Sequence, residues 1–407
     1  MQVPEQIAAA QVERMMKFQE VILKAAAGKL KWWEAAEILG ITDRQLRRMR
    51  QSYEEHGYDG LYDYRKRRPS PKRAPMKTVE QVLHLYRERY YDFNVRHFHE
   101  KLVEEHGIGL SYTWVKMLLQ GAGLVKQQSR RGAHRKRRPR RPMRGMMLHI
   151  DASRHAWFQD ERWYDLLSIL DDATSEIYYA QLVEEEGTCT AMAALRQVIE
   201  THGLFCALYS DRGSHFFVTP KAGEKVDASR LTQLGRALEE LGIRMIPAYS
   251  PQARGRMERN YRTWQGRLPQ ELRLRGITTA PAANVFLRDR YIAEFNRRFA
   301  VAAEQRGTAF VRCHRKDLDW VFSLQQERTV NRDNTVVVDN RVLQIEKSRW
   351  RNTLAGCAVR VHQHLDGRVS IRFGPHVVAQ WSAEQLPATR TPRPASARPL
   401  GHRRTAA

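Results

Sequence analysis

The chain has 407 residues and a mass of 47.5 kDa, which suits roughly two to four domains. Hydrophobic residues make up 42% of the sequence, so most of the chain is expected to fold around buried cores. No stretch approaches about 18 consecutive apolar residues. The N-terminal segment MQVPEQIAAAQVERMMKFQE carries acidic residues where a signal peptide would be basic. These features predict a protein that is neither secreted nor membrane-spanning.

The cysteines indicate a reducing compartment. They are Cys189, Cys206, Cys313 and Cys357. They lie far apart in the sequence and no two form a Cys-X-X-Cys pair, which argues against a disulfide framework and against a zinc ribbon.

The net charge of +24 is concentrated in a few segments. Residues 65–77 hold seven Lys or Arg, residues 130–141 hold eight and the tail 385–407 holds five, without one Asp or Glu among them. Proline-containing basic segments cannot pack into a core, but they can follow a polyanion such as nucleic acid. The alternative is that these runs are merely solvated. Two such runs between folded blocks favour nucleic-acid binding.

Residues 1–64 are predicted to form a helix-turn-helix domain. One amphipathic helix covers 5–27, and KWWEAAEILGITDRQLRRMRQSY predicts a helix, a turn at Gly40 and a second helix capped by Thr42, with Gln45 completing a capping box. The apolar side chains of the second helix fall on one face and its arginines mostly on the other, where a recognition helix would meet the major groove. The apolar residues are Leu46, Met49 and Tyr53, and the arginines are Arg44, Arg47, Arg48 and Arg50. The alternative is a three-helix bundle with a basic face.

After a basic linker at 65–77, residues 78–128 predict a second, winged helix-turn-helix domain. The periodic segment VEQVLHLYRERY, a helix from Val95 to Glu105 and a third helix capped by Ser111 carry this prediction. Three histidines, His97, His99 and His106, resemble a zinc set, but no cysteine lies nearby. We therefore interpret them as ordinary core or surface histidines.

A second basic linker at 129–145 precedes a segment in which strands and helices alternate. Its predicted order over 146–310 is βββαβαβα, which indicates a mixed α/β sheet. Asp171 and Asp172 fall between two β-rich runs and are interpreted as hairpin-turn residues.

Three acidic residues in this block are candidate metal ligands. Asp151 and Asp211 each end a hydrophobic strand, where open α/β sheets place their ligand sites. Glu258 lies on a helix whose apolar stripe can pack on the sheet. Three converging carboxylates would be compensated by two Mg²⁺ about 3.5 to 4 Å apart, which activate an attacking oxygen and stabilise a leaving one in phosphodiester chemistry. Taken singly, each acid could be a turn, cap or salt-bridge residue.

Three motifs carry a family resemblance: HIDAS at 149–153, SDRGSHF at 210–216 and SPQARGRMER at 250–259. Together they resemble the integrase-type DDE transposases of the retroviral-integrase superfamily, and more narrowly bacterial insertion-sequence transposases of the ISNCY group. The resemblance implies an RNase H-like catalytic core in which Asp151, Asp211 and Glu258 bind two Mg²⁺, with Mn²⁺ as a substitute. Asp211 and Glu258 are separated by 46 residues, roughly eleven more than is common in that family. The surplus falls in the polar stretch 217–229, which predicts a surface loop.

The final block, 325–382, predicts short strands joined by Asp-Asn and Asp-Gly turns. Such strands predict a small SH3-like β-barrel, as in integrase C-terminal domains, followed by a basic tail at 383–407. DNA contact is favoured for this block, and an oligomerisation role is the alternative.

The predicted fold class is therefore multidomain: α-helical helix-turn-helix domains, an α/β RNase H-like core and a small C-terminal β-barrel. The predicted function is a DNA transposase that binds terminal inverted repeats through residues 28–126 and catalyses Mg²⁺-dependent 3′-end cleavage and strand transfer into target DNA. Transesterification needs no nucleotide, and no GxxxxGK[ST] loop is present. The alternatives are a catalytically inactive DNA-binding regulator and an RNase H-like nuclease.

The predicted partners are double-stranded DNA, namely the terminal repeats and the target, and further copies of the chain, at least a dimer on DNA. No membrane partner is predicted, and a cytoplasmic, nucleoid-associated bacterial location is expected. The remaining DNA-contacting residues are expected in the second basic linker and around Glu258. They are Arg130, Arg131, Arg135, Lys136, Arg137, Arg138, Arg254, Arg256, Arg259 and Arg262.

Overall fold

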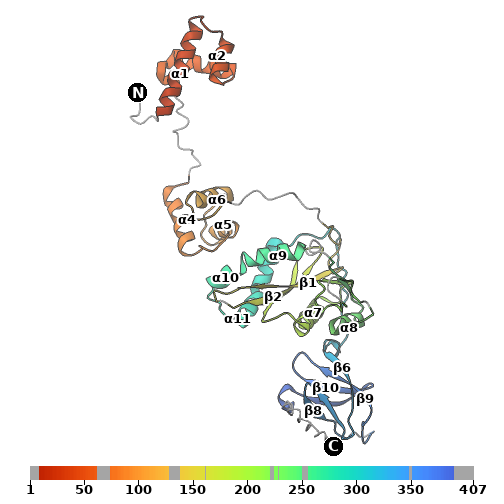
Figure 1. The fold of residues 1–407 in the computed structure, drawn as a ribbon. Helices are drawn as coiled ribbons and strands as arrows, with labels where there is room; N and C mark the ends of the chain where they lie inside the picture. Colours follow the sequence, from red (N-terminus) through yellow and green to blue (C-terminus); the bar gives the residue numbers. More distant parts are fainter. Residues whose placement is uncertain are drawn as a thin grey trace, which may run out of the picture. The chain divides into compact units, whose positions relative to one another are not determined.

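The computed structural model of the chain divides into two compact units, residues 1–81 and 82–407, and each is described by itself (Figure 1). The described residues are 9–61, 74–127, 138–160, 162–220, 224–227, 229–249, 255–347 and 351–388. The predictions for the two basic linkers and the basic tail therefore fall largely outside the described residues. Within the described part of the chain, no helix is long and apolar enough to cross a membrane.

Residues 9–61 of the first unit form a small helical bundle that ends in a short 3-10 helix. Its elements are α1 (Ala9–Ala26), α2 (Trp32–Leu39), α3 (Asp43–His56) and η1 (Gly57–Leu61). Gly40 ends α2 with a φ of 62°, a conformation that glycine adopts without strain. The Thr42 hydroxyl accepts the Gln45 N–H at 3.3 Å and caps α3, as predicted, although no reciprocal Gln45 contact is recorded for the described residues. Leu46 is buried in the core beside Met49 and Tyr53. The predicted pair of helices and its apolar face are confirmed.

The second helical block also matches the predicted helices. It contains α4 (Met76–Glu88), α5 (Val95–Glu104) and α6 (Tyr112–Gly121). Asn94 caps α5 by accepting the His97 N–H at 3.0 Å, and Ser111 caps α6 by accepting the Trp114 N–H at 3.3 Å. Residues 74–127 contain no strand, so this described segment has no wing.

The next segment forms a five-stranded sheet in the order β3-β2-β1-β4-β5. The strands are β1 (Leu148–His155), β2 (Tyr164–Asp171), β3 (Ile177–Val183), β4 (Ala207–Ser210) and β5 (Arg244–Pro247). β1, β2 and β3 pair antiparallel, whereas β4 and β5 run parallel to β1. This arrangement confirms the predicted mixed α/β core.

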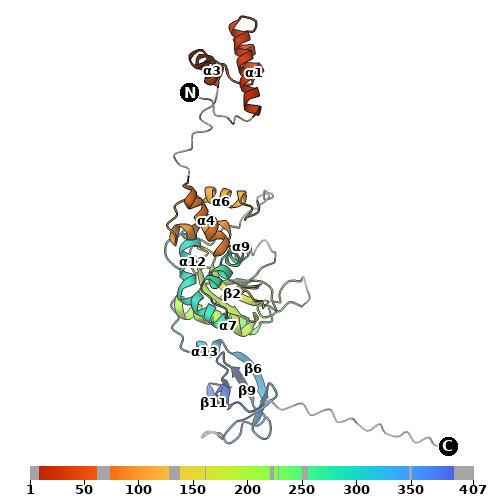
Figure 2. The ribbon, with the colours of Figure 1, turned by 90° about the vertical axis from the view of Figure 1, so that its left-hand side faces the viewer.

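Helices cover both faces of this sheet (Figure 2). The first face packs on α7 (Thr188–His202) and α8 (Gln233–Glu240) through side chains such as Leu148 and Ile150. The second face packs on the helices that follow β5. These are α9 (Gly255–Gln265), α10 (Leu268–Leu274), α11 (Ala280–Phe286), the π-helix η4 (Leu287–Tyr291) and α12 (Ile292–Phe299). The alternation of side chains along β1 therefore sorts its residues between two helical layers.

The second helical block is joined to the core by buried ion pairs. Glu271 on α10 is 5% exposed and accepts from His97 at 2.7 Å and Lys101 at 2.9 Å, both on α5. Burial alone would raise the pKa of the Glu271 carboxyl, but these partners outweigh it and hold that pKa far below its usual value. Arg267 pairs with Glu100 at 2.6 Å. Residues 82–127 and the core therefore share one charged, largely buried interface.

The C-terminal segment forms a four-stranded antiparallel sheet and a separate hairpin. The sheet order is β11-β10-β9-β6, with β6 (Leu324–Thr329), β9 (Ala358–Gln363), β10 (Val369–Phe373) and β11 (His376–Trp381). The hairpin pairs β7 (Thr335–Val338) with β8 (Arg341–Gln344) through an Asp339-Asn340 turn in which both residues have positive φ. One hydrophobic cluster joins hairpin and sheet. The predicted strands are present and β6 was not predicted, but the two sheets do not close into a barrel within the described residues. The predicted SH3-like barrel is thus not confirmed. Two short helices, α13 (Leu318–Val321) and η5 (Ala383–Gln385), lie before and after these strands in the chain.

Candidate active site

Asp151 and Asp211 occupy neighbouring positions on two parallel strands. β1 pairs with β4 in the register Leu148 to Leu208 and His149 to Tyr209, an offset that carries Asp151 to Asp211. Asp151 lies within β1 and is 8% exposed, and Asp211 directly follows β4. Adjacent strands are about 4.8 Å apart. The two predicted carboxylates thus emerge beside each other at the carboxyl end of β4.

The backbone around each carboxylate holds it in place. One Asp151 oxygen accepts the Ala152 N–H at 3.0 Å, and one Asp211 oxygen accepts the Gly213 N–H at 2.9 Å. A Cβ atom on Gly213 would lie 3.1 Å from that Asp211 oxygen and 2.9 Å from Cε1 of His215. The glycine in SDRGSHF therefore permits a close approach that a larger residue would disturb.

The helix that carries Glu258 is anchored to β1 beside Asp151. The Tyr261 hydroxyl donates to the backbone carbonyl of Asp151 and accepts from the Ser168 hydroxyl at 2.9 Å. Gln265 donates to the Ser153 hydroxyl at 3.0 Å. Because these contacts advance along both elements together, α9 runs beside β1 in the same direction.

The position of Glu258 follows from these contacts. Glu258 is two turns before Gln265, which places both on nearly the same side of α9. Gln265 reaches Ser153, which shares a face of β1 with Asp151. Glu258 is exposed. It is therefore placed on the side of α9 that meets the Asp151 face, with its side chain in solvent.

The side chains of Asp151, Asp211 and Glu258 do not lie close enough together in this structure to bind one metal ion. Among the described residues, no group of three or more His, Cys, Asp or Glu side chains lies close enough together to hold a metal ion. Three carboxylates repel one another without a cation, and the exposed Glu258 side chain can change rotamer. Carboxylate oxygens are the donors that Mg²⁺ prefers. The chemistry and backbone placement of the three residues fit a divalent cation. For all three carboxylates to bind one cation, the Glu258 side chain must change rotamer and turn toward the strands that carry Asp151 and Asp211.

Asp172 has a larger role than the turn residue that the sequence indicated. Its neighbour Asp171 does form the turn, accepting the Ala173 and Thr174 N–H groups at 2.9 Å each. Asp172 is fully buried and accepts from His149 at 2.6 Å and from the Arg141 N–H at 2.7 Å.

Two arginines complete the surroundings of Asp172. Arg138 and Arg256 both donate to the oxygen of Asp172 that His149 contacts. Burial alone would raise the pKa of the Asp172 carboxyl, but these hydrogen bonds and cations hold that pKa far below its usual value. Burial also lowers the pKa of His149, against the effect of Asp172. The sequence signal for this network was the pair of adjacent acids in the turn.

The predicted DNA-contacting residues fall into three groups. Arg44, Arg47, Arg48, Arg259 and Arg262 are exposed. Arg130, Arg131, Arg135, Lys136, Arg137 and Arg254 lie outside the described residues.

The third group is engaged within the protein. Arg50 pairs with Glu54 at 2.6 Å and lies over the Trp32 ring. Arg256, whose side chain is 16% exposed, points toward Asp172 together with Arg138. The expectation that Arg256 contacts DNA does not match this inward placement.

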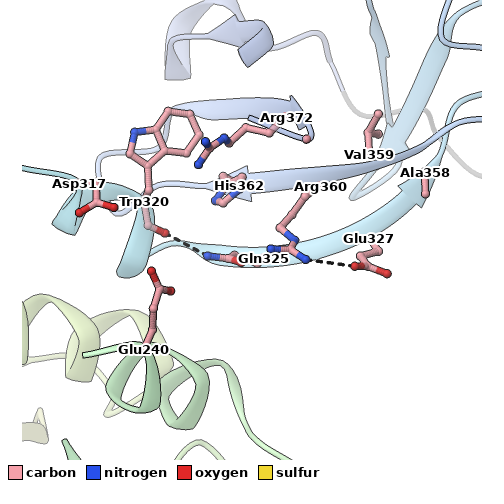
Figure 3. A pocket seen from close by; sticks show the side chains of 11 residues that line it. Glu240, Asp317, Trp320, Gln325, Glu327, Ala358, Val359, Arg360, His362 and Arg372 are labelled. Atoms are coloured by element: carbon pink, nitrogen blue, oxygen red, sulfur yellow. Dashed lines mark hydrogen bonds and ion pairs between the residues drawn. The ribbon is translucent and has the colours of Figure 1, made fainter. Parts of the chain in front are cut away.

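A pocket of about 400 Å³ lies at the junction of α8 and the C-terminal sheet (Figure 3). Trp320, His362 and Arg372 line one side of it, and Glu240 reaches it from α8. None of its lining residues was predicted to be functional. His362 is 3% exposed and contacts the Ser323 hydroxyl at 2.9 Å. Burial and the nearby cationic side chains lower the pKa of His362 to about 4.

We expect His362 to make the C-terminal segment acid-sensitive. Its folded-state pKa lies below the unfolded value of about 6.5, so the unfolded chain binds the proton more readily. The contribution of neutral His362 to the free energy of unfolding is fully present above about pH 6.5 and is lost as the pH falls toward 4. Allowing for partial solvent screening, the loss should be about 2 kcal/mol. Urea unfolding at several pH values should show it in the wild type and a flatter profile in His362→Gln. Equal slopes would contradict this origin.

Comparison with known proteins agrees with the architecture. Residues 19–70 match a helix-turn-helix domain model. The protein y4bF of Sinorhizobium fredii, named as a transposase, is 32% identical over 374 residues, which cover 90% of this chain and 80% of that protein. The transposase for insertion sequence IS1202 of Streptococcus pneumoniae is 31% identical over 314 residues, which cover 69% of this chain and 67% of that protein.

Among solved structures, the chain is similar to one chain of a simian T-cell lymphotropic virus intasome, solved with the PP2A regulatory subunit B56 gamma. The identity is 13% and the TM-score 0.32, over 70% of this chain and 93% of that one. The HTLV-2 integrase catalytic core domain, solved with magnesium, gives 15% identity and a TM-score of 0.26 over 37% of this chain and 90% of that one. The assignment of this chain to a family rests on the two transposases, because the match to y4bF spans most of both chains. The chain belongs to the family of insertion-sequence transposases.

Proposed function

We propose that this transposase cleaves the 3′ ends of its element and joins them to target DNA, using Asp151, Asp211 and Glu258 as a divalent-metal site. The observation that carries the proposal is the side-by-side position of Asp151 and Asp211, with α9 fastened to the Asp151 carbonyl. Perturbation of any one acid should therefore affect the same site.

The chain's own residues would orient the reaction. Two Mg²⁺, or Mn²⁺ in their place, would supply charge for the attacking and leaving oxygens of the phosphodiester. Asp151 and Asp211 hold their carboxylates in fixed backbone settings, and Glu258 supplies the third from α9. Arg259 and Arg262 on the same helix are exposed and would pair with DNA phosphates. Water attacking in line would hydrolyse a phosphodiester at the element end and leave a 3′-hydroxyl and a 5′-phosphate. That 3′-hydroxyl would then attack a target phosphodiester, so that a new phosphodiester forms as the target bond breaks and the target strand leaves with a free 3′-hydroxyl.

One experiment tests this function and its main alternative. The purified chain is incubated with the genomic DNA that flanks its gene, with and without Mg²⁺, and nicked 3′ ends are mapped. Nicks at fixed terminal positions only with Mg²⁺ support the transposase reaction. Specific binding without nicking would instead favour a catalytically inactive DNA-binding regulator.

Recognition of the element ends is assigned to α3. Arg47 and Arg48 are exposed on α3, outside the face through which Leu46 packs, and no ion pair joins either to another described residue. Arg47→Ala and Arg48→Ala should each weaken terminal-repeat binding, by roughly 1 to 3 kcal/mol where a base is read. A phosphate contact would instead weaken all sequences alike and flatten the salt dependence by about one unit. Binding is measured by fluorescence anisotropy over a salt series.

The matched control is Lys24→Ala, an exposed cation of the same unit that pairs with Glu20 at 2.6 Å. It should leave binding within about twofold of wild type. If Arg47→Ala and Arg48→Ala behave like Lys24→Ala, recognition lies elsewhere, and residues 112–120 are the next candidate.

Assembly and location complete the proposal. An element has two ends, and each chain has one candidate triad, so we propose at least two copies on DNA. The domain limits are proposed at 1–64, 78–128, 146–310 and 325–382, with basic linkers at 65–77 and 129–145 and a basic tail at 383–407. The C-terminal segment is proposed to contact DNA. The site of action is the bacterial cytoplasm, at the nucleoid.

A further inference from the structure

We propose that Asp172 is a positioning residue that fixes β1 and the first turn of α9 in the geometry required for metal binding. The inference rests on the proposed function, because it concerns the same carboxylates. Asp172 is not itself one of the candidate metal ligands. It acts through His149 and Arg256, each of which precedes a candidate ligand by two residues.

Because of this two-residue spacing, the contacts of Asp172 with His149 and Arg256 fix the backbone next to Asp151 and Glu258. His149 and Asp151 lie on the same face of β1, so a fixed His149 ring sets the rotation and height of the strand at Asp151. Arg256 lies in the first turn of α9, as does Glu258, so the pull on Arg256 sets where that turn begins. Tyr261 fixes the next turn to Asp151. Asp172 and Tyr261 thus hold the helix on either side of Glu258.

Arg138 adds a third element to the same carboxylate. Its guanidinium donates to Asp172, and its backbone carbonyl accepts from Arg256 at 2.8 Å. The Arg141 N–H donates to the other Asp172 oxygen at 2.7 Å. The C-terminal end of the second basic linker is therefore attached to the turn that contains Asp172. One buried anion joins the linker, β1 and α9.

The energetic cost of burying the Asp172 carboxylate indicates that this residue has a role beyond packing. A fully buried carboxylate must recover its lost hydration from its partners, and an apolar turn residue would avoid that cost. Asp171, one residue earlier, shows what a purely local carboxylate does here. It accepts from the Gly145, Ala173 and Thr174 N–H groups and contacts neither β1 side chains nor α9 in the recorded hydrogen bonds.

The test compares Asp172→Asn with Asp171→Asn in the full-length protein. Both changes remove a buried charge from the same turn, so both should lower the urea midpoint. Mn²⁺ binding without DNA is measured by electron paramagnetic resonance, and nicking of the terminal repeat is measured across a Mg²⁺ series. We expect Asp172→Asn to weaken Mn²⁺ binding at least fivefold and to raise the half-saturating Mg²⁺ concentration similarly. Asp171→Asn should change neither by more than about twofold.

A second variant covers the case in which Asp172→Asn does not fold. Arg256→Gln keeps Asp172 paired with His149 and Arg138 but releases α9, and it should shift the Mn²⁺ and Mg²⁺ titrations in the same direction. Wild-type titrations in both Asp172→Asn and Arg256→Gln, or equal shifts in Asp171→Asn, would overturn the positioning role.

The two readouts separate this inference from the proposed function. If the wild type binds Mn²⁺ but nicks no DNA, the proposed reaction fails and the positioning role is still decided by Mn²⁺ affinity. If the wild type neither binds Mn²⁺ nor nicks DNA, both are overturned.

Discussion

The Asp211→Asn protein should bind the terminal repeat as tightly as the wild type but produce no nicked or joined 3′ ends. The substitution keeps the size of the side chain and removes the negative charge that a metal ligand needs. Asp211 belongs to the core and α3 to a separate compact unit, so binding of the ends should be spared. Removing a ligand for a metal that stabilises the leaving oxygen should cost several kcal/mol of transition-state stabilisation, enough to take nicking below detection. Gel assays of nicking with Mg²⁺ measure it.

The same outcome is expected for Asp151→Asn and for Glu258→Gln. A matched control is Glu200→Gln, which alters an exposed acid of α7 paired with Arg196 at 2.8 Å. It should nick at the wild-type rate. Retained Mg²⁺-dependent nicking in any of the three variants would show that this acid is not part of the metal site.

The Glu271→Gln substitution should cause the largest loss of stability. Glu271 is buried and accepts from His97, Lys101 and Arg275. The neutral amide removes the buried one of the two carboxylates that Lys101 contacts and leaves its ammonium with Glu105, which is more exposed. Breaking a buried ion pair by removing one charge costs about 3 to 5 kcal/mol. Urea unfolding followed by circular dichroism should show the loss, and limited proteolysis should show earlier cleavage within 82–127.

Glu294→Gln provides the comparison at the surface. Glu294 pairs with Arg290 at 2.7 Å, and the Arg290 side chain is 62% exposed. An exposed pair four residues apart in a helix contributes about 0.3 to 0.5 kcal/mol. Similar stability losses in the two variants would mean that the Glu271 contacts do not hold the second helical block against the core.

Local signals in the sequence were sufficient for most elements. Thr42, Gly40 and Ser111 cap or end helices where their chemistry indicates, and the Asp339-Asn340 pair forms the predicted hairpin turn. Asp151 and Asp211 were predicted to be neighbours because each follows a run of apolar residues. Asp211 does follow the end of β4, but the prediction that Asp151 ends its strand is wrong, because β1 continues to His155 through its pairing with β2. These features depend on residues close together in the chain, which is why a single sequence indicates them.

Features that depend on distant residues were missed. β6 (Leu324–Thr329) has the polar sequence LQQERT, and it is a strand because it pairs with β9. Asp172 is a network residue because residues at 138, 149 and 256 meet there. The contact between Glu271 and His97 of α5 could not be predicted from the sequence either, because these residues are 174 positions apart. Pairing partners and buried ion pairs are tertiary properties that periodicity does not encode.

The buried interface between the second helical block and the core also decides where the protein can be re-engineered. Glu271 and Glu100 bind α5 to the helices that follow β5, so a graft that replaced residues 82–127 would leave charges stranded on the retained surface. Residues 1–81 form a compact unit with its own core. A chimera joined between Leu61 and Ala74 should therefore replace the native helix-turn-helix domain with a foreign one while retaining the native catalytic core. Retargeting of this transposase to a new pair of ends should begin at that junction.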